Sequence, residues 1–371
     1  MHPTYKRVHP NFKLNGVAVS FHDLDEVSYS LIKEGHPHEW DFGDFLLNWI
    51  DKEPTIQVKT SGSTGTPKMI VLQKQQLVNS ALATGKFFKL EAGGSALLCL
   101  SGTYIAGKMM LVRAMILGLE LDWVEPTATP LLGSDKTYDF CAMVPLQLEN
   151  SFGHLNQIKT LIVGGAPMSQ SLKEKVQLLK TGIYETYGMT ETISHIALKK
   201  VNQADAVDSN LSVRRASLVE NNFSVLPNVS ITIDERDCLV IQAPDINSEP
   251  VVTNDIVKIM SETEFEWLGR YDNVINSGGV KLIPEQIELK LASILKSRFI
   301  VAGIPDEKLG QKLILIVEEN KENNELLEKI KSLESLEKYE IPKDILFMKN
   351  FIETENGKIS RIKTLQQFLN I

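Results

Sequence analysis

A run of hydroxyl residues and glycines closes on a lysine near residue 60. Residues 60–68 read Thr-Ser-Gly-Ser-Thr-Gly-Thr-Pro-Lys and follow the β-prone stretch Thr55–Val58. Glycines let backbone N–H groups approach phosphate oxygens, hydroxyls add donors, and a lysine brings a mobile positive charge. A Walker A loop is excluded, because Pro67 stands where that motif needs glycine and Met69 follows the lysine. The strand before the run and the amphipathic stretch Gln75–Phe88 after it favour a phosphate-binding loop over a flexible polar linker. The candidate phosphate-binding residues are Thr60, Ser61, Gly62, Ser63, Thr64, Gly65, Thr66 and Lys68.

Two further segments could contribute to a nucleotide site. Residues 163–167 read Val-Gly-Gly-Ala-Pro, where missing side chains would let a flat ring lie against the backbone, although an ordinary strand-to-helix turn explains them equally well. Residues 184–191 bring aromatic rings that can stack on a base, hydroxyls that can bond phosphate, and Glu191, which can hold Mg²⁺. A polar helix start over packed tyrosines is the alternative for this segment. The candidates are Gly164, Gly165, Ala166, Pro167, Glu185, Thr186, Tyr187, Gly188, Thr190 and Glu191.

Three charged residues further along the chain could complete such a site. Asp255 follows an expected strand end and Arg270 comes fifteen residues later. A carboxylate can accept hydrogen bonds from ribose hydroxyls and a guanidinium can pair with phosphate, although spacing alone favours a surface ion pair. Lys358 lies in the glycine turn Asn356–Arg361, where an ordinary exposed lysine is the usual outcome. Position alone makes none of the three catalytic.

The elements that must position these residues form an α/β pattern from about residue 41 to residue 200. Strand-like apolar runs alternate there with helical patterns, which is typical of a mostly parallel sheet with ligand loops at the carboxyl ends of its strands. The expected strands are Ala96–Leu100, Phe140–Val144 and Thr160–Val163, and the expected helices are Gly107–Leu117, Leu146–Phe152 and Ser169–Leu179.

Two smaller parts are expected after this region. Between residues 231 and 267, short alternating strands broken by prolines predict a small β-rich subdomain. Helices at Pro284–Lys296 and Glu325–Glu334, with short strands between and after them, predict a separate α+β domain of about a hundred residues. We therefore expect one domain over residues 1–269 and another over residues 270–371.

Composition excludes several classes of protein. A chain of 371 residues with 43% hydrophobic content is globular, and its charge of −8 is interspersed, so no broad basic field favours nucleic acid. Its three cysteines are too scattered for a zinc motif or a disulfide framework. The N-terminus lacks an apolar signal region, and the most apolar stretch, Met109–Leu121, is too short to span a bilayer. We expect a soluble, cytoplasmic protein that binds no membrane.

Taken in order, the motifs resemble those of the adenylate-forming superfamily of acyl- and aryl-CoA synthetases over about residues 55–363. The resemblance implies that residues 60–68 bind phosphate, that residues 164–167 and 184–191 are the adenine and magnesium motifs, and that Asp255 binds ribose. It also implies the superfamily's fold, with a large N-terminal adenylation domain and a mobile C-terminal domain. The N-terminal part ahead of the phosphate loop is shorter than is usual in the superfamily.

The same resemblance implies a reaction in two halves. A carboxylate would attack ATP to give an acyl-adenylate and pyrophosphate, and the thiolate of coenzyme A would then displace AMP. Lys68, Thr190 and Glu191 would act on the phosphates and Mg²⁺, and Lys358 matches the superfamily's C-terminal catalytic lysine. The segment Gly269–Asp272 resembles the hinge motif, with Asp272 at the pivot about which the C-terminal domain rotates. The residues implied for coenzyme A are Ser277, Gly278 and Gly279.

Within the superfamily, three features look most like the branch that activates o-succinylbenzoate in menaquinone biosynthesis: the segment Met143–Leu148, the Gly-Gly-Ala-Pro run at residues 164–167 and the short length. The second carboxylate of that acid would need a cationic or hydroxyl partner. The candidates are Ser101, Thr103, Lys108 and Arg113. Surface solvation is an equal alternative for the two cations.

Two positions depart from the superfamily's pattern. Tyr104 stands where a histidine is frequent, and a phenol can wall an aromatic acid and donate a hydrogen bond but cannot be cationic. Met69 replaces a glycine that often follows the loop lysine. Three other functions also agree with these motifs: another aryl- or acyl-CoA ligase, a carrier-protein-loading adenylation domain, and a nucleotide-binding protein without turnover. The motifs are equally compatible with a homo-oligomer.

Overall fold

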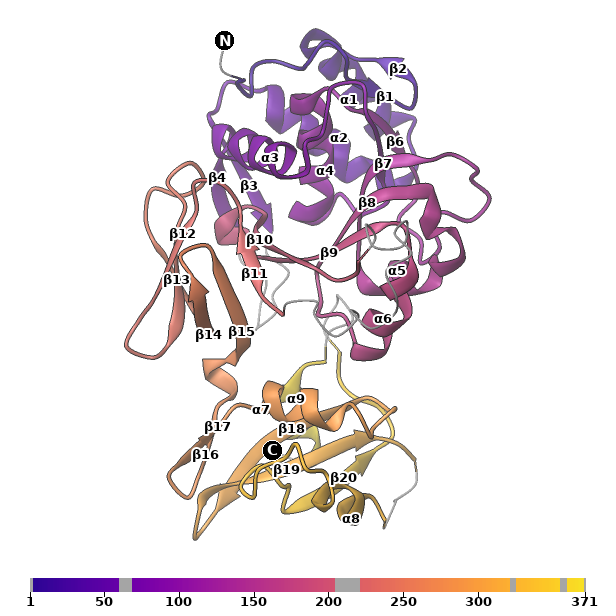
Figure 1. Ribbon diagram of the computed structural model, residues 1–371. Helices are drawn as coiled ribbons and strands as arrows, with labels where there is room; N and C mark the ends of the chain where they lie inside the picture. Colours follow the sequence, from indigo (N-terminus) through magenta and orange to yellow (C-terminus); the bar gives the residue numbers. More distant parts are fainter. Residues whose placement is uncertain (1–2, 60–68, 204–220, 321–324, 354–358, 370–371) are drawn as a thin grey trace. The chain divides into compact units, whose positions relative to one another are not determined.

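The computed structural model describes residues 3–59, 69–203, 221–320, 325–353 and 359–369 of the chain, which folds into two compact units (Figure 1). The first unit comprises Met1–Ile231, Ile241–Val251 and Glu262–Glu264. The second comprises Thr232–Val240, Val252–Ser261 and Phe265–Ile371. The chain therefore passes from one unit to the other within the strands of its β-rich region.

A mostly parallel sheet forms the centre of the first unit. Its parallel strands follow the order β9-β8-β7-β5-β6, and β10 and β11 extend it in antiparallel pairing beyond β9. These strands are β5 (Ser95–Leu98), β6 (Glu120–Trp123), β7 (Tyr138–Met143), β8 (Ile158–Val163), β9 (Gly182–Gly188), β10 (His195–Lys200) and β11 (Phe223–Val225). At the other edge, β1 (Lys13–Leu14) pairs with β6 and β2 (Val17–Ala18) pairs with β1. The predicted α/β fold with parallel strands is confirmed.

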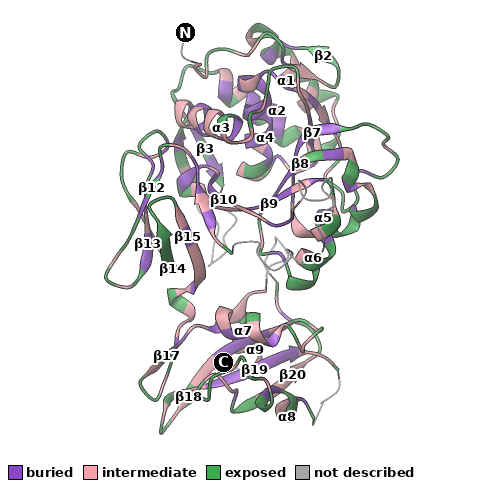
Figure 2. Cartoon of the chain, in the orientation of Figure 1, coloured by how far each residue is buried: buried purple, intermediate pink, exposed green. Residues whose placement is uncertain are grey.

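Helices supply much of the rest of the core of this unit. They are α1 (Leu24–Lys33), α2 (Pro37–Ile50), α3 (Lys74–Phe88), α4 (Ile105–Leu117), α5 (Pro145–Asn150) and α6 (Gln170–Lys175). Helix α4 is apolar around its whole circumference and almost wholly buried (Figure 2), as expected for a helix inside a core. It ends where Gly118, at φ +74°, donates its N–H to the carbonyl of Ala114.

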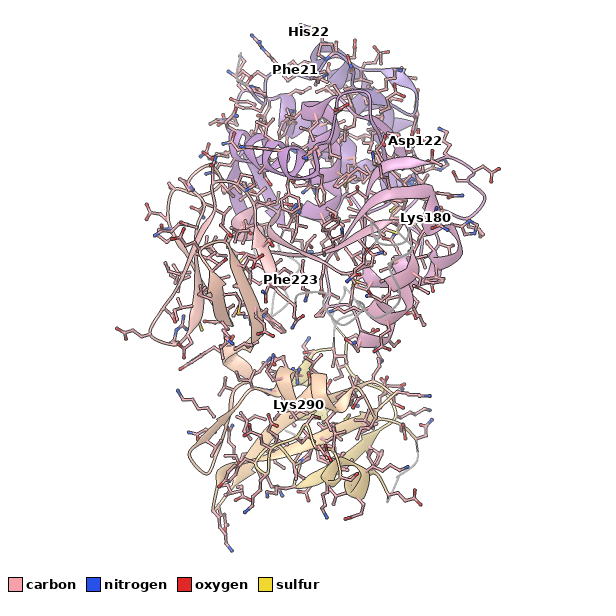
Figure 3. All side chains as sticks on the ribbon, in the orientation of Figure 1. Phe21, His22, Asp122, Lys180, Phe223 and Lys290 are labelled. Carbon is pink, nitrogen blue, oxygen red and sulfur yellow. The ribbon has the colours of Figure 1, made fainter. Side chains whose placement is uncertain are left out.

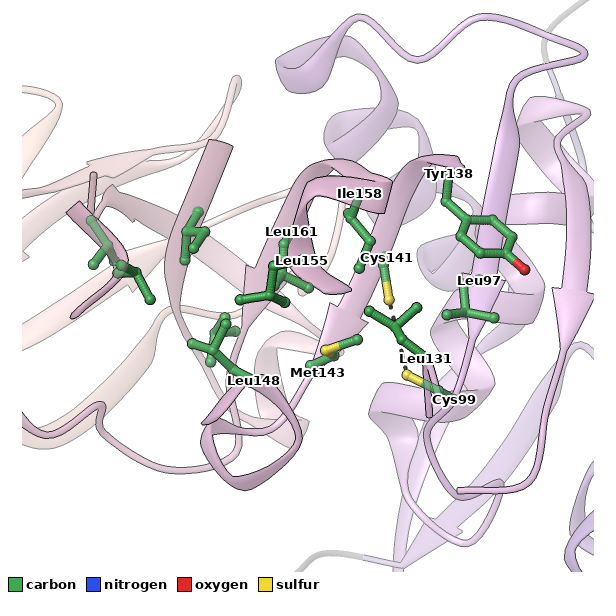
Figure 4. Close-up of a cluster of buried hydrophobic side chains, with 14 of the residues drawn as sticks. Leu97, Cys99, Leu131, Tyr138, Cys141, Met143, Leu148, Leu155, Ile158 and Leu161 are labelled. Carbon is green, nitrogen blue, oxygen red and sulfur yellow. Dashed lines mark hydrogen bonds between the residues drawn. The ribbon is translucent and has the colours of Figure 1, made fainter. Parts of the chain in front are cut away.

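Helices α5 and α6 pack on the strands through one hydrophobic cluster (Figure 4). Leu148 of α5 and Leu172 of α6 join side chains from β7, β8 and β9 in it. The cluster includes Cys99 and Cys141, whose sulfurs lie 3.9 Å apart and are both reduced. Burial raises the pKa of the Cys141 thiol well above its usual range, so this thiol is inert at neutral pH.

The β-rich region supplies further strands of the large sheet, and the C-terminal part has a sheet of its own. In the first, β12 (Ser230–Ile233), β13 (Cys238–Gln242), β14 (Val251–Ser261) and β15 (Glu264–Arg270) follow one another, where the sequence predicted a small β-rich part. In the second, β17-β16-β19-β18 are neighbours and β20 pairs with β19. These are β16 (Ile275–Ser277), β17 (Val280–Leu282), β18 (Phe299–Asp306), β19 (Gly310–Glu318) and β20 (Asp344–Met348).

Strands β18 and β19 are buried on both faces because each face has its own cluster. Alternate residues point to opposite faces of a strand, so Val301 and Leu315 contribute to one cluster and Ile300 and Ile316 to the other. Helices α7 (Pro284–Leu291) and α8 (Leu326–Lys331) cover the first face, and α9 (Arg361–Leu369) contributes Leu365 to the second. None of the helices within the described ranges is long and apolar enough to cross a membrane.

Candidate active site

The adenine motifs predicted from sequence lie at the carboxyl ends of two neighbouring strands. Strands β8 and β9 run in parallel with Val163 opposite Glu185, and the Thr186 hydroxyl donates to the Val163 carbonyl at 3.2 Å. A Cβ on Gly164 would lie 2.4 Å from the Thr186 oxygen, and Gly165 has φ +82°. Glycine is therefore required at the first position by close approach and favoured at the second by the backbone. The backbone at these two positions is therefore free of side chains.

The predicted magnesium motif continues from β9 into a tight turn. A 3-10 turn, η4 (Thr190–Thr192), contains Glu191, whose side chain is exposed. A Cβ on Gly188 would lie 2.3 Å from the Ser194 carbonyl oxygen, so glycine permits the close return of the chain. Ile193 has φ +66°, which is an outlier for a β-branched residue and marks stored backbone strain at this turn. Exposed Glu191 suits Mg²⁺, which commonly takes one or two carboxylates together with substrate phosphates.

Arg113 lies inside the first unit and is only 2% exposed. Its Nε donates to the Thr84 hydroxyl at 3.3 Å, and a terminal nitrogen donates to the Ser194 hydroxyl at 2.6 Å. Within the described ranges, no carboxylate forms an ion pair with it, and burial lowers its pKa to about 9. The alternative that Arg113 is a solvated surface residue is wrong. The guanidinium is instead buried and hydrogen-bonded to Ser194, two residues after the turn that contains Glu191.

His195 completes this buried cluster. Its Nε2 lies 3.3 Å from the Thr84 hydroxyl and its Nδ1 lies 3.3 Å from the Ser194 hydroxyl. Burial, together with the charge of Arg113, holds the pKa of His195 well below its usual range, so the imidazole is neutral. Sequence reasoning missed Thr84, Ser194 and His195. Ser194 and His195 could have been suspected from sequence, because they come soon after the predicted magnesium motif.

The neutral state of His195 predicts a pH dependence of stability. The unfolded chain takes up a proton on this imidazole below about pH 6.5, whereas the folded protein does not, so the free energy of unfolding should fall as pH falls. The slope contributed by one such group is about 1.4 kcal/mol per pH unit until its folded pKa is reached. Urea unfolding at about pH 7.5 and about pH 5.5 should show a smaller loss for His195→Gln than for the natural protein. Equal losses would mean that His195 is protonated in the folded state.

The other acyl-site candidates hold a loop together before α4. The Ser101 hydroxyl donates to Thr103 at 3.0 Å, and the Thr103 hydroxyl donates to Asp41 of α2 at 2.5 Å. Lys108, whose pKa is lowered by burial, donates to the carbonyls of Gly102 and Thr103. Tyr104 is half-buried just before the helix. Lys108 thus donates to local carbonyls, whereas no carboxylate in the described part of the chain pairs with Arg113.

In the second unit, the predicted ribose carboxylate and the predicted pivot share one arginine. Asp255 is 6% exposed and accepts from the Trp267 indole at 3.2 Å, and Arg270 lies 3.5 Å from the same oxygen. Arg270 also lies 3.4 Å from Asp272, which accepts from the Asn254 amide at 3.2 Å. The buried position of Asp255 differs from the surface ion pair that spacing alone favoured.

The glycines expected at the coenzyme A site form a turn in the same unit. Ser277 ends β16, and Gly278 and Gly279 have φ +60° and +85°. Such angles favour glycine, and the turn lets β17 pair back on β16. The Gly278 N–H also donates to the Leu309 carbonyl at 2.8 Å, which ties the turn to the loop before β19.

The predicted phosphate loop, residues 60–68, and Lys358 lie outside the described residues. Strands β3 (Thr55–Lys59) and β4 (Met69–Gln73) flank the loop and pair antiparallel, with Lys59 opposite Met69. Glu353 and Ile359, which flank the Lys358 segment, form a β-bridge. Among the described side chains, no group of three histidine, cysteine or acidic residues could hold a metal by itself.

The chain is similar to one protein family and to proteins of known structure. The model of the family described as AMP-binding enzymes matches residues 52–216. A structure of an acyl-CoA synthetase (AMP-forming)/AMP-acid ligase II-like protein from Dyadobacter fermentans is 39% identical, with a TM-score of 0.59 over 92% of this chain and 98% of that one. The o-succinylbenzoate coenzyme A synthetase of Bacillus subtilis, solved with ATP and magnesium, is 19% identical, with a TM-score of 0.70 over 92% of this chain and 82% of that one, and shows a similar fold.

Sequence relatives add a second kind of similarity. The 2-succinylbenzoate–CoA ligase of Listeria monocytogenes is 25% identical over 94% of this chain and 75% of its own length. That of Haemophilus influenzae is 27% identical over 72% of this chain and 60% of its own length. The chain thus spans between 60% and 75% of the length of these two relatives.

Proposed function

Because this chain belongs to the AMP-binding enzymes, the family of AMP-forming acyl-CoA synthetases, we propose that it joins o-succinylbenzoate to coenzyme A. The observation that carries the choice of acid is Arg113, a buried guanidinium without an acidic partner among the described residues, linked to the turn that bears Glu191. A dicarboxylic acid would supply the missing negative charge. The relatives named 2-succinylbenzoate–CoA ligase support the same choice.

The first half-reaction would form the acyl-adenylate. One carboxylate oxygen of the acid attacks the α-phosphorus of ATP, and the bond from that phosphorus to pyrophosphate breaks. The loop hydroxyls and Lys68 would hold the β- and γ-phosphates, Thr190 the α-phosphate, and Lys358 the attacking carboxylate. Mg²⁺ on Glu191 would offset the charge on the phosphate oxygens. Catalysis would come chiefly from positioning and charge neutralisation.

The second half-reaction would form the thioester. The thiolate of coenzyme A attacks the acyl carbon, the bond to AMP breaks, and AMP leaves. Asp255 would keep the ribose in place during both steps. Rotation about Asp272 would remove Lys358 and bring the Ser277–Gly279 turn to the pantetheine chain.

Pyrophosphate exchange across a panel of carboxylic acids tests this function. Exchange should be fastest with o-succinylbenzoate, and thioester and AMP should then form only with free coenzyme A. Faster exchange with benzoate or a fatty acid would make the enzyme a different acyl-CoA ligase. Exchange without transfer to free coenzyme A would favour a carrier-protein-loading enzyme.

Arg113 should discriminate between acids with one and two carboxylates. Replacing Arg113 with methionine removes a charged hydrogen-bond donor and should raise KM for o-succinylbenzoate by about 10- to 100-fold. Arg113→Lys should recover only part of this, because an ammonium cannot reproduce the forked donor. KM for ATP in both variants is the control, measured by pyrophosphate exchange. An unchanged KM for the dicarboxylic acid would remove Arg113 from the acyl site.

A further inference from the structure

A second buried ion cluster lies beside the predicted adenine slot, which is defined here as the turn Gly164–Pro167 and the ring of Tyr187. At its centre is Glu185 of β9, which is 6% exposed. One carboxylate oxygen accepts from the backbone N–H of Met168 at 3.1 Å. Since Met168 directly follows the turn, this hydrogen bond fixes the end of the turn to β9.

The other carboxylate oxygen of Glu185 forms ion pairs with two lysine ammonium groups. It lies 3.1 Å from Nζ of Lys173 on α6 and 3.0 Å from Nζ of Lys199 on β10. The side chain of Lys199 is 11% exposed and that of Lys173 is 26% exposed. The cluster therefore joins the helix that follows the turn to a strand on the opposite side of β9.

The cluster extends to the second wall of the slot through an aromatic pair. Nζ of Lys199 lies 4.6 Å from the ring centroid of Phe223, labelled in Figure 3, and also donates to Asn221 at 3.3 Å. The rings of Phe223 and Tyr187 are 5.7 Å apart. Cation–π and aromatic contacts both depend on ring position, so moving Lys199 would shift Tyr187 as well.

The charges of the cluster keep Glu185 ionised. Burial by itself would raise the pKa of this carboxyl, but Lys199, Lys173 and the Met168 N–H outweigh burial, and the pKa is lowered. Burial lowers the pKa of Lys199, and the charge of Glu185 opposes that effect. Removing the carboxylate charge would leave two lysines facing one another with little water, so both would move.

We infer that Glu185 is a positioning residue that sets the distance between the two walls of the adenine slot, and thereby the affinity and base selectivity for ATP. Its carboxylate is occupied by Met168, Lys173 and Lys199, so it acts through them and not by touching the nucleotide as the motif alone suggested. The inference rests on the proposed function only in taking this slot as the site of the base.

Two variants and a matched control test the inference. Glu185→Gln keeps an oxygen for the Met168 N–H and removes the charge. Lys199→Met keeps the length of the side chain and removes the ammonium group that lies beside Glu185 and over the Phe223 ring. Asp51→Asn is the control, because it removes the acidic partner of Lys74, another buried lysine of the same unit. ATP, AMP and GTP binding is measured by calorimetry on the whole chain, beside KM values and urea unfolding.

Both test variants should bind ATP and AMP about 10- to 100-fold more weakly, with less preference for ATP over GTP and an unchanged KM for the acid. Asp51→Asn should change stability alone. ATP affinity and base preference equal to those of the natural protein, in folded Glu185→Gln and Lys199→Met, would overturn the inference. So would a loss of ATP affinity in Asp51→Asn as large as theirs. Nucleotide binding is measured by calorimetry without any carboxylic acid. If no acid supported pyrophosphate exchange, the proposed function would be rejected, but the calorimetric test of Glu185 would still stand.

Discussion

A Lys358→Ala enzyme is expected to form the acyl-adenylate about 10²- to 10³-fold more slowly than the natural protein, while still making thioester from supplied acyl-adenylate. The lysine would neutralise charge only while the carboxylate attacks the α-phosphorus. It would have left the site before coenzyme A enters. Pyrophosphate exchange measures the first half-reaction, and single-turnover release of AMP from synthetic acyl-adenylate measures the second.

Lys363→Ala is the matched control for that variant. Lys363 is an exposed lysine of α9 and lies five residues further along the chain. Its replacement should leave both half-reactions unchanged, since a solvated lysine contributes little to a distant reaction. If Lys358→Ala slowed both half-reactions equally, its assignment to adenylation would be wrong.

Removing Arg361 is expected to destabilise the second unit by about 1.5–3 kcal/mol, because a partly buried carboxylate loses its charged hydrogen-bond donors. Two guanidinium nitrogens of Arg361 donate to the two oxygens of Glu288 at 2.6 Å each, and one also donates to the Val301 carbonyl at 2.8 Å. The two side chains are 22% and 19% exposed. The pair therefore fastens α9 to α7 and β18.

Hydrogen exchange of β18 and β19 amides in Arg361→Ala reports this loss directly, because those strands form the centre of the unit. Lys331→Ala is the control: it removes an exposed pair with Glu328 on α8 and should cost less than about 0.5 kcal/mol. The double variant Glu288→Leu with Arg361→Met should recover most of the loss, since no unpaired charge remains. Equal protection in Arg361→Ala and Lys331→Ala would show that the pair contributes little.

The central parallel strands were predictable from sequence because strands buried on both faces consist of consecutive apolar residues. The runs at residues 96–100, 140–144 and 160–163 overlap β5, β7 and β8, which are covered on both faces. Helix ends were less predictable. The helix expected over Pro284–Lys296 ends at Leu291, and soon after it the Ser293 hydroxyl donates to the Lys290 carbonyl. A serine that competes for the last carbonyls of a helix favours its termination.

The sequence by itself determined the order of the nucleotide motifs and the residues they contain, because glycines, hydroxyls and carboxylates bind phosphate, base and ribose through local backbone geometry. Only the tertiary structure decided which charges are buried and what they face. Arg113 sits in an apolar helix that no local pattern distinguishes from a solvated position, and its partners Thr84 and Ser194 come from other elements. Glu185 likewise lies in a nucleotide motif, yet its carboxylate is held by lysines from α6 and β10. Electrostatic partners depend on distance in space, which spacing along the chain does not encode.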